Sequence, residues 1–579
     1  MNTNKKDFYE LKKNLKTNRS FLTNVKVALL GDNATQFLAQ SIVSYAIEYN
    51  FNLDLFEAEY AQIEKQIFDL KSQLYLHNPE FVLIYNSSRN LLKKFYHISF
   101  QQRENFALEL ARDLESKLDI LNQNLTANII VFNFVEEDDM VFGNYGNKVK
   151  GSFIYQIREL NLKLMELSQR YSNLFICDLN RITAEYGLTN SIDPKLYITS
   201  DMHLNLDVLP EVAKNVCDII SAAKGNIKKC VIVDLDNTLW GGIVGDDGVE
   251  NLQIGQLGIG KAYTEFQMWL LELKKRGIIL AVCSKNTEDI AREPFLSHPD
   301  MILKLEDFAV FIANWENKVD NIITIQKVLN IGFDSIVFID DNPFERNMVR
   351  QAIPGIIVPE LPQDPSEFLP YLKSLNLFET TFYTREDNIR TQQYQQEAKR
   401  MLIQKNYTTE DEYLESLNML AKVEEFNDFN IPRVAQLTQR SNQFNLRTIR
   451  YNVEEIKKVS ESANFLTFAF YLRDDYGDYG LTGIVILETQ KPDVYFIDTF
   501  IMSCRVLNRT FEEFILNHIV KVAKDKGARE IIGEYIQTKK NSIVKDLYKN
   551  LGFLAKENIW ILNIENYNMK KTFIKYENE

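Results

Sequence analysis

The sequence predicts an α/β protein made of three units, each a β-sheet covered by helices. The chain has 579 residues, whereas one domain usually holds about 100–200. Over most of its length, short apolar runs alternate with stretches of helical periodicity, a pattern typical of strands joined by crossover helices. Near the end, apolar runs follow one another more directly, which favours antiparallel pairing.

The first predicted unit spans residues 1–225. Its apolar runs predict buried strands over 25–32, 51–58, 81–86, 127–134 and 173–179. The segments between them are long enough for crossover helices, so a parallel sheet is expected. The polar segment KGNIKK (224–229) predicts a linker.

The second predicted unit, residues 228–375, has the pattern of a doubly wound parallel core. Its strands are expected within 230–236, 278–286 and 335–343. The segment AYTEFQMWLLELKKR (262–276) places its apolar side chains on one face of a helix.

A helical connector over 376–410 and a mixed sheet over 411–579 complete the prediction. The stretch 378–425 is charged, helix-prone and free of glycine and proline. Three adjoining, mostly antiparallel strands are expected at 465–474, 481–488 and 493–503, followed by an amphipathic helix at 509–527. The glycines of YGDYGLTG (476–483) suit a hairpin turn.

Composition narrows the function classes. A net charge of −14 disfavours sequence-independent binding to a nucleic-acid backbone. No run approaches the roughly 18–20 apolar residues of a membrane helix, and the first twenty residues lack the apolar core of a signal peptide. The five cysteines show no CxxC pairing. A cytoplasmic protein is therefore expected.

Two carboxylates follow the first strand of the second unit, in VIVDLDNTLWGG (231–242). Asp234 and Asp236 lie at its carboxyl end, the edge where open α/β sheets bind ligands. Residues two apart in an extended segment point the same way, so these carboxylates repel each other unless a cation lies between them. Mg²⁺ suits this role because it prefers oxygen ligands. Taken alone, the string is weak evidence, and a solvated loop with an Asx turn is the alternative.

Later features favour the metal site. Ser284 ends the next strand, Lys318 begins an amphipathic helix, and Asp340 and Asp341 end a third strand. A carboxylate nucleophile, a hydroxyl, a lysine and an acidic pair are the groups that phosphoryl transfer through an aspartyl intermediate requires.

This order of motifs resembles the haloacid-dehalogenase-like superfamily, and DLDNTLWGGIVGDDG (234–248) resembles the signature of its FkbH-like subfamily. The resemblance implies that Asp234 takes the phosphoryl group and that Asp236 is the general acid and base. Thr238 and Ser284 are then expected to bind phosphate oxygens, Lys318 to neutralise the phosphoryl group, and Asp234, Asp340 and the backbone carbonyl of Asp236 to hold Mg²⁺, with Asp341 as an alternative ligand. Asn286 and Arg346 are further candidates for substrate binding.

The FkbH-like resemblance also implies a substrate and a partner. That subfamily is associated with converting 1,3-bisphosphoglycerate to a glyceryl thioester on an acyl carrier protein. Cys283 is a candidate thiol for holding the acyl group, and the alternative is a small apolar side chain buried at a strand end. The insert between Asp236 and the helix near Ala262 is too short for a full cap domain, so a carrier's pantetheine arm could enter.

The first unit resembles SGNH hydrolases at LLGDNATQ (29–36) and SDMHLN (200–205). Asn33 occupies the place of the nucleophilic serine, and an amide cannot attack an ester. His203 matches the base, but the usual Asp-x-x-His spacing is contracted to Asp201-Met202-His203. An inactive scaffold or carrier-docking unit is therefore predicted, with Asn86 as a loop cap.

The last unit resembles GNAT acetyltransferases around 496–516. That family holds the coenzyme A pyrophosphate at a helix N-terminus with R-x-x-G-x-G/A, and here Asn508 and Thr510 replace both glycines. Two interpretations of the nearby arginines, Arg505 and Arg509, remain open. Arg505 and Arg509 bind a phosphopantetheine phosphate, or they pair with Glu512 and Glu513.

The preferred function is Mg²⁺-dependent removal of phosphate from a phosphorylated three-carbon acid, with the acyl unit loaded onto a carrier protein. The enzymatic alternative is a simple phosphatase of a small phosphate ester. The non-enzymatic alternative is a carrier-docking module that retains a metal site.

Overall fold

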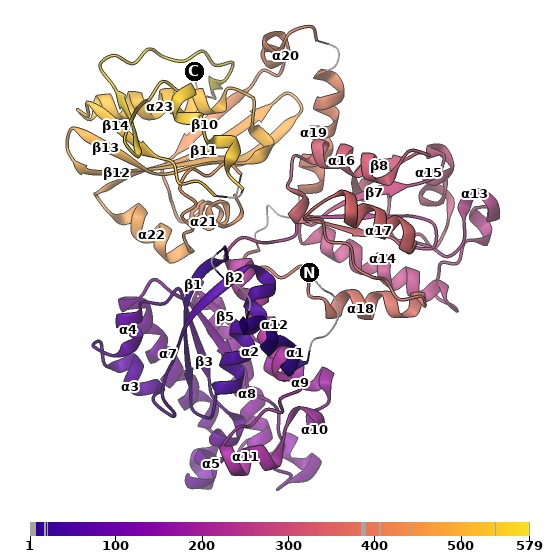
Figure 1. Ribbon diagram of the computed structural model, residues 1–579, viewed down its shortest axis with the longest axis vertical. Helices are drawn as coiled ribbons and strands as arrows, with labels where there is room; N and C mark the ends of the chain where they lie inside the picture. Colours follow the sequence, from indigo (N-terminus) through magenta and orange to yellow (C-terminus); the bar gives the residue numbers. More distant parts are fainter. Residues whose placement is uncertain are drawn as a thin grey trace. The chain divides into compact units, whose positions relative to one another are not determined.

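The computed structural model describes residues 7–16, 19, 21–383, 390–404, 407–441, 443–538 and 540–577. The chain divides into two compact units, Met1–Ala223 and Lys224–Glu579 (Figure 1). Parts of the predicted connector 376–410 lie outside the described residues. None of the helices in the described part combines the length and apolar character that a bilayer crossing demands.

The first unit is built on a five-stranded parallel sheet, as predicted, with strand order β2-β1-β3-β4-β5. Its strands are β1 (Thr23–Gly31), β2 (Phe51–Glu57), β3 (Phe81–Tyr85), β4 (Asn128–Phe132) and β5 (Leu174–Cys177). Its helices are α1 (Phe8–Lys13), α2 (Gln36–Ala46), α3 (Ile63–Phe68), α4 (Gln73–His77), α5 (Ser88–His97), α6 (Phe100–Arg103), α7 (Phe106–Asn124), α8 (Phe153–Arg170), α9 (Leu179–Tyr186), α10 (Leu188–Ser191), α11 (Pro194–Ser200) and α12 (Leu209–Ala223).

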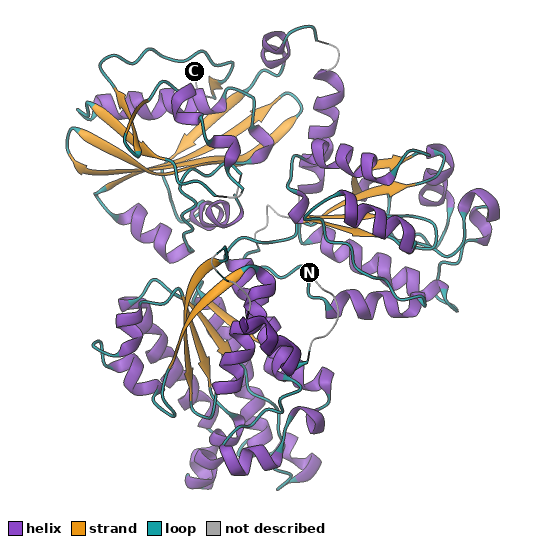
Figure 2. Ribbon diagram, in the orientation of Figure 1, coloured by secondary structure: helices purple, strands orange, loops and turns teal. Residues whose placement is uncertain are grey.

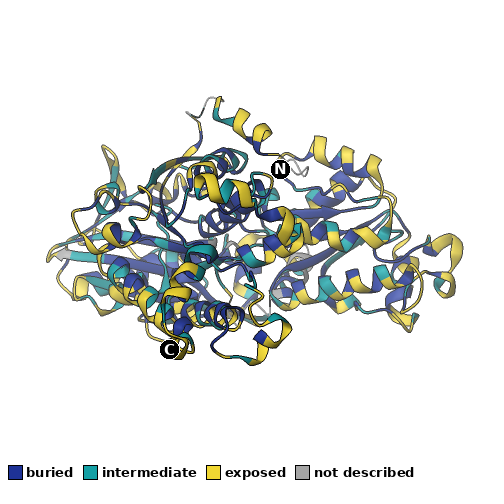
Figure 3. Cartoon of the chain, turned by 90° about the horizontal axis from the view of Figure 1, so that it is seen from below, coloured by how far each residue is buried: buried dark blue, intermediate teal, exposed yellow. Residues whose placement is uncertain are grey.

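Helices cover both faces of this sheet (Figure 2). Because strand side chains alternate between faces, Val27 and Leu29 pack with α2 and α12, whereas Ala28 and Leu30 pack with α7 and α8. Burial on both faces explains why these strands are continuous apolar runs. In Figure 3 the strands are correspondingly dark, and the exposed positions lie mostly on helices and loops.

The second unit begins with a four-stranded parallel sheet of order β8-β7-β6-β9. Its strands are β6 (Cys230–Val233), β7 (Ile279–Ser284), β8 (Phe308–Ala313) and β9 (Ile336–Ile339). Helices α14 (Gly260–Lys275), α15 (Glu288–Ser297) and α18 (Phe368–Ser374) cover one face. The other face packs against α16 (Lys318–Leu329) and α17 (Pro343–Ala352). The predicted doubly wound core is confirmed, and the short helix α13 (Val244–Asp247) lies in the small insert after β6.

The same unit contains the predicted mixed sheet, with order β15-β16-β14-β13-β12-β11-β10-β17. Its strands are β10 (Leu420–Glu424), β11 (Phe465–Asp474), β12 (Gly477–Lys491), β13 (Val494–Met502), β14 (Glu530–Glu534), β15 (Leu554–Lys556), β16 (Ile559–Asn563) and β17 (Lys575–Tyr576). Helix α23 (Phe511–Asp525) packs on one face. The other face is covered by α21 (Ile431–Arg440) and α22 (Val453–Glu461), and the remaining helices are α19 (Arg390–Gln404), α20 (Glu410–Ser416) and α24 (Leu547–Asn550).

One local prediction for this region is wrong, and the predicted hairpin turn lies earlier than expected. The helix-prone stretch 378–425 ends in a strand, because β10 pairs with β11 and fully buries Ala421; sheet pairing outweighs the local helix preference. Most of YGDYGLTG lies within β12, since the turn comes earlier, between Asp474 and Gly477.

Candidate active site

The predicted site residues converge at the carboxyl edge of the four-stranded parallel sheet. Asp234 directly follows β6, and Ser284 is the last residue of β7. Lys318 begins α16 after β8, while Asp340 follows β9. Parallel strands end at a common edge, so residues far apart in sequence meet there.

Lys318 is held between two carboxylates. Its Nζ lies 2.8 Å from Asp234 Oδ2 and 2.6 Å from Asp340 Oδ2. The lysine and aspartate side chains are at most 10% exposed. Burial opposes the charged amine, but the two carboxylates outweigh it and raise the pKa of Lys318 above its ordinary value. The lysine therefore stays charged beside the proposed nucleophile.

The acidic residues fit a divalent cation. Carboxylate oxygens of Asp234, Asp340 and Asp341 lie within 4.8 Å of one another. Asp234 Oδ1 is buried and has no hydrogen-bond partner in the described part of the chain. Burial and the charge of Asp234 raise the pKa of Asp340 to about 7, although Lys318 opposes this. A cation here would satisfy the orphaned oxygen and relieve the repulsion.

Asp236 has a different environment, in which its carboxylate is fully engaged. Its Oδ1 accepts from Trp240 Nε1 at 2.9 Å and from the backbone N–H of Val244 at 3.1 Å. Its Oδ2 accepts from Asn286 Nδ2 at 3.1 Å. Burial nevertheless raises the pKa of Asp236, which suits a group that must carry a proton and then release it. The sequence analysis did not assign a role to Trp240; the only signal for one was the position of this tryptophan within the signature 234–248.

The two glycines after Trp240 fix the loop that carries these donors. A Cβ on Gly241 would lie 2.7 Å from Gln253 Oε1, and Gly242 has φ of +102°. Gly241 also exchanges two backbone hydrogen bonds with Gln253. The two glycines therefore let the insert fold back against Gln253. In this conformation the backbone N–H of Val244 reaches Asp236.

The family model described as "FkbH, N-terminal domain" matches residues 26–221. A solved structure, the N-terminal part of the protein BF1531 from Bacteroides fragilis, is 50% identical, with a TM-score of 0.62. It covers 65% of this chain and 100% of its own, contains a phosphatase domain, and was crystallised with Mg. The chain belongs to the FkbH-like family of haloacid-dehalogenase-like phosphatases.

Other comparisons add little to the FkbH-like assignment. No curated protein matches the chain. Ribosomal-protein-S18-alanine N-acetyltransferase from Escherichia coli is 14% identical and covers 26% of this chain and 99% of its own, with a TM-score of 0.20. Spermidine N-acetyltransferase from Vibrio cholerae is 12% identical and covers 25% and 97%, with a TM-score of 0.21. Scores this low carry no argument about the activity of the C-terminal region.

In this FkbH-like site, Thr238 and Arg346 face the acidic loop. Thr238 Oγ1 donates to Asp341 Oδ1 and accepts from the Asp341 N–H, both at 3.1 Å. Arg346 donates to the backbone carbonyls of Asp340 and Asp341 at 2.8 and 2.6 Å. Both side chains therefore hold the loop that carries the predicted metal ligands. Phosphate binding by Thr238 and substrate binding by Arg346 stay predictions.

Cys283 does not reach the site. It is fully buried on the α16 and α17 face of the sheet, and its Sγ donates to the Lys318 carbonyl at 3.8 Å. Burial raises the pKa of its thiol to about 12. A protonated, enclosed thiol is a poor nucleophile, so this placement argues against the acyl-holding role predicted from the sequence.

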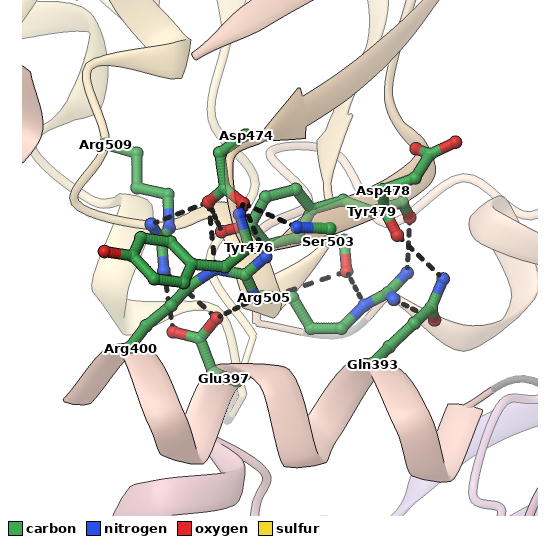
Figure 4. Close-up of polar contacts among 11 residues, drawn as sticks. Gln393, Glu397, Arg400, Asp474, Tyr476, Asp478, Tyr479, Ser503, Arg505 and Arg509 are labelled. Atoms are coloured by element: carbon green, nitrogen blue, oxygen red, sulfur yellow. Dashed lines mark hydrogen bonds and ion pairs between the residues drawn. The ribbon is translucent and has the colours of Figure 1, made fainter. Parts of the chain in front are cut away.

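The C-terminal arginines are engaged by the connecting helix α19 (Figure 4). Arg509 Nη2 donates to the two oxygens of Glu397 at 2.7 and 3.0 Å, and Arg505 Nη1 donates to Gln393. In the described part, Arg509 thus pairs with Glu397 instead of Glu512 or Glu513. Glu397 pairs with Arg509, and Asn508 and Thr510 carry side chains where the GNAT motif has glycine. The loop therefore does not fit a coenzyme A pyrophosphate.

Proposed function

We propose that this chain is a Mg²⁺-dependent enzyme that removes phosphate from a phosphorylated three-carbon acid and allows its acyl unit to be loaded onto a carrier-protein thiol. The observation that carries the proposal is the buried arrangement of Lys318 between Asp234 and Asp340, beside an orphaned oxygen of Asp234. Such an arrangement neutralises the repulsion between a carboxylate nucleophile and a phosphate dianion.

The chain's own side chains account for the phosphoryl transfer. Asp234 attacks phosphorus while the bond to the leaving oxygen breaks, and Asp236 gives that oxygen its proton. Ionised Asp236 then takes a proton from water, whose oxygen attacks phosphorus and releases phosphate and Asp234. Lys318 stabilises the charge on the transferring oxygens throughout. Mg²⁺, held by Asp234, Asp340 and Asp341, would supply further charge neutralisation.

The acyl unit is proposed to pass directly to the carrier. The carrier's thiol sulfur forms a bond to the acyl carbon of the acyl phosphate, and the carbon–oxygen bond to phosphate breaks. Inorganic phosphate leaves with the bonding electrons and takes up the proton of the thiol. The burial of Cys283 supports this direct route over one through the protein's own thiol. The proposed phosphatase step then acts on the second phosphate of the substrate.

Exposed apolar side chains near the site support the proposal that a bulky partner docks there. Ile243, Trp315 and Phe344 are 44%, 73% and 69% exposed, and they lie in or beside the segments that follow β6, β8 and β9 at the edge carrying Asp234. Because the insert after β6 is small, these side chains border an edge without a large lid. Exposed apolar side chains gathered at one edge are common where another protein docks.

The proposal is tested by intact-mass spectrometry of the full chain with Mg²⁺, 1,3-bisphosphoglycerate and a holo carrier protein. The parent protein is expected to form a glyceryl adduct on the carrier and to release both phosphates. The Asp234→Asn variant is expected to release only the first of the two phosphates. Phosphate release without an adduct would favour a simple phosphatase. Carrier binding without turnover, equal in the parent and in Asp234→Asn, would favour a docking module.

A further inference from the structure

A serine, a histidine and a glutamate meet at the carboxyl edge of the N-terminal sheet. Ser87 Oγ lies 3.4 Å from His203 Nδ1, and His203 Nε2 lies 2.9 Å from Glu137 Oε2. Ser87 and His203 are 1% and 2% exposed, and Glu137 is 9% exposed. Ser87 follows β3, Glu137 follows β4, and His203 follows α11. Three separate segments therefore supply one hydrogen-bonded chain.

The direction of these hydrogen bonds follows from the glutamate. Burial disfavours its charge, but His203 and Arg89 together hold the pKa of Glu137 below its ordinary value. An ionised carboxylate only accepts hydrogen bonds, so His203 Nε2 carries a proton and donates it to Glu137 Oε2. In the tautomer whose single ring proton is on Nε2, Nδ1 is unprotonated. The lone pair of Nδ1 then faces the Ser87 hydroxyl and can accept its proton. This is the geometry of a nucleophile, a base and an orienting carboxylate.

Ser87 is also placed as nucleophiles commonly are in α/β proteins. It caps the ten-residue helix α5, and its Oγ accepts from the backbone N–H of Arg89 at 3.2 Å. Its own N–H donates to Asp32 Oδ1 at 2.8 Å, which ties it to the end of β1. The N-terminus of α5 favours negative charge on the hydroxyl or on an adjacent oxyanion.

The neighbouring Asn33 supplies an independent sign of an unfilled site. It is 3% exposed, and its Oδ1 has no hydrogen-bond partner in the described part of the chain. Its Nδ2 donates to Asp32 Oδ1, the oxygen that also accepts from Ser87. A buried acceptor left open beside a serine and histidine matches a site that takes a polar ligand.

We propose that the N-terminal unit contains a second active site, in which Ser87 is an acyl-accepting nucleophile for a small carboxylic ester, His203 is its base, and Glu137 is a positioning residue. Ser87 Oγ bonds to the acyl carbon while its proton passes to His203 Nδ1. The carbon–oxygen bond of the ester breaks, and the leaving alkoxide takes that proton. Water then gives a proton to His203 while its oxygen bonds to the acyl carbon. The bond from that carbon to Ser87 Oγ breaks, Ser87 Oγ takes the proton back from His203, and the carboxylic acid leaves. Sequence motifs did not indicate this site, because the resemblance to SGNH hydrolases puts the nucleophile position at Asn33. Ser87 lies in another loop.

The test uses the full-length protein with two small probes, 4-nitrophenyl acetate and a fluorophosphonate. One fluorophosphonate adduct, mapped to the peptide containing Ser87, and slow release of nitrophenolate are expected. Ser87→Ala should abolish both, and His203→Ala should slow both by about 100-fold or more. The neighbouring Ser88→Ala is the matched control and should label as the parent does.

Glu137 is tested by comparing two substitutions. Glu137→Gln keeps the size but removes the charge, so labelling should fall, whereas Glu137→Asp should recover part of it. Circular dichroism and denaturant unfolding report whether each variant has folded. A parent protein that neither forms the adduct nor hydrolyses the ester overturns the proposal, as does a Ser87→Ala variant that labels at the parent rate.

Discussion

Trp240 Nε1 donates a 2.9 Å hydrogen bond to Asp236 Oδ1, and the indole ring is itself fully buried. The ring packs edge-on against Phe295 at 5.5 Å between centroids. A residue of the FkbH-like signature therefore links the predicted general acid to the apolar core. This relationship gives the tryptophan a chemical role in addition to packing.

Trp240→Phe should lower kcat roughly 10–100-fold, since a hydrogen bond to a charged group contributes about 1.5–3 kcal/mol. The indole donor favours ionised Asp236, so its loss raises the pKa of Asp236 further. The acid form then persists to higher pH, and the alkaline limb of kcat/KM should move upward. The pH profile of phosphate release measures this. The control is Trp269→Phe on α14, and equal effects of both substitutions would refute the role.

Gly241→Ala should reduce activity by about 10-fold or more. The new Cβ would lie 2.7 Å from Gln253 Oε1 and 2.9 Å from Tyr263 Cε2, so the loop carrying Val244 must shift. Small displacements of a catalytic group are costly in rate. Gly245→Ala, whose Cβ would meet only Asn286 Oδ1 at 4.0 Å, is the matched control. If both variants turn over like the parent, the loop does not position Asp236.

Cys283→Ala should retain phosphate release and carrier loading, with a loss of about 1–2 kcal/mol of stability from a small cavity. The buried thiol should also resist iodoacetamide at neutral pH, because its pKa is raised to about 12. Activity assays, chemical denaturation and mass spectrometry measure these three outcomes. Loss of carrier loading in a folded variant would restore the acyl-holding role.

Asp474→Asn should destabilise the C-terminal unit by about 3–5 kcal/mol, because it leaves a buried arginine unbalanced. Arg400 Nε and Nη2 donate to the two Asp474 oxygens at 2.9 and 2.7 Å, and both side chains are at most 1% exposed (Figure 4). Denaturant unfolding measures the change. The exposed neighbour Asp475 supplies the control, Asp475→Asn, and similar losses for both would contradict the account.

Both parallel sheets could be predicted from the sequence because strands buried on two faces are continuous apolar runs. The convergence of Asp234, Lys318 and Asp340 followed from the same topology, since each residue comes just after a strand or at the start of the next helix. These side chains meet because parallel strands end at one edge of the sheet, and the apolar pattern of the sequence predicts where those strands lie.

Side-chain direction and loop contacts were harder to predict. Cys283 and Ser284 are adjacent, yet alternation turns the thiol into the core under α16. Ser87 and Glu137 are 50 positions apart in separate loops, and neither belongs to a recognisable motif. Their meeting with His203 depends on tertiary packing that no local pattern encodes. The buried strand β10 was missed for the same reason.

The measurement that tests the central claim most directly is the single-turnover rate of phosphate release in Asp234→Asn with Mg²⁺ present. Loss of the carboxylate nucleophile should lower this rate at least about 1,000-fold, and rapid-quench mass spectrometry should detect a phosphorylated Asp234 in the parent alone. A variant that releases phosphate within about 10-fold of the parent rate, with no phosphorylated parent protein, would contradict the assignment of Asp234 as nucleophile.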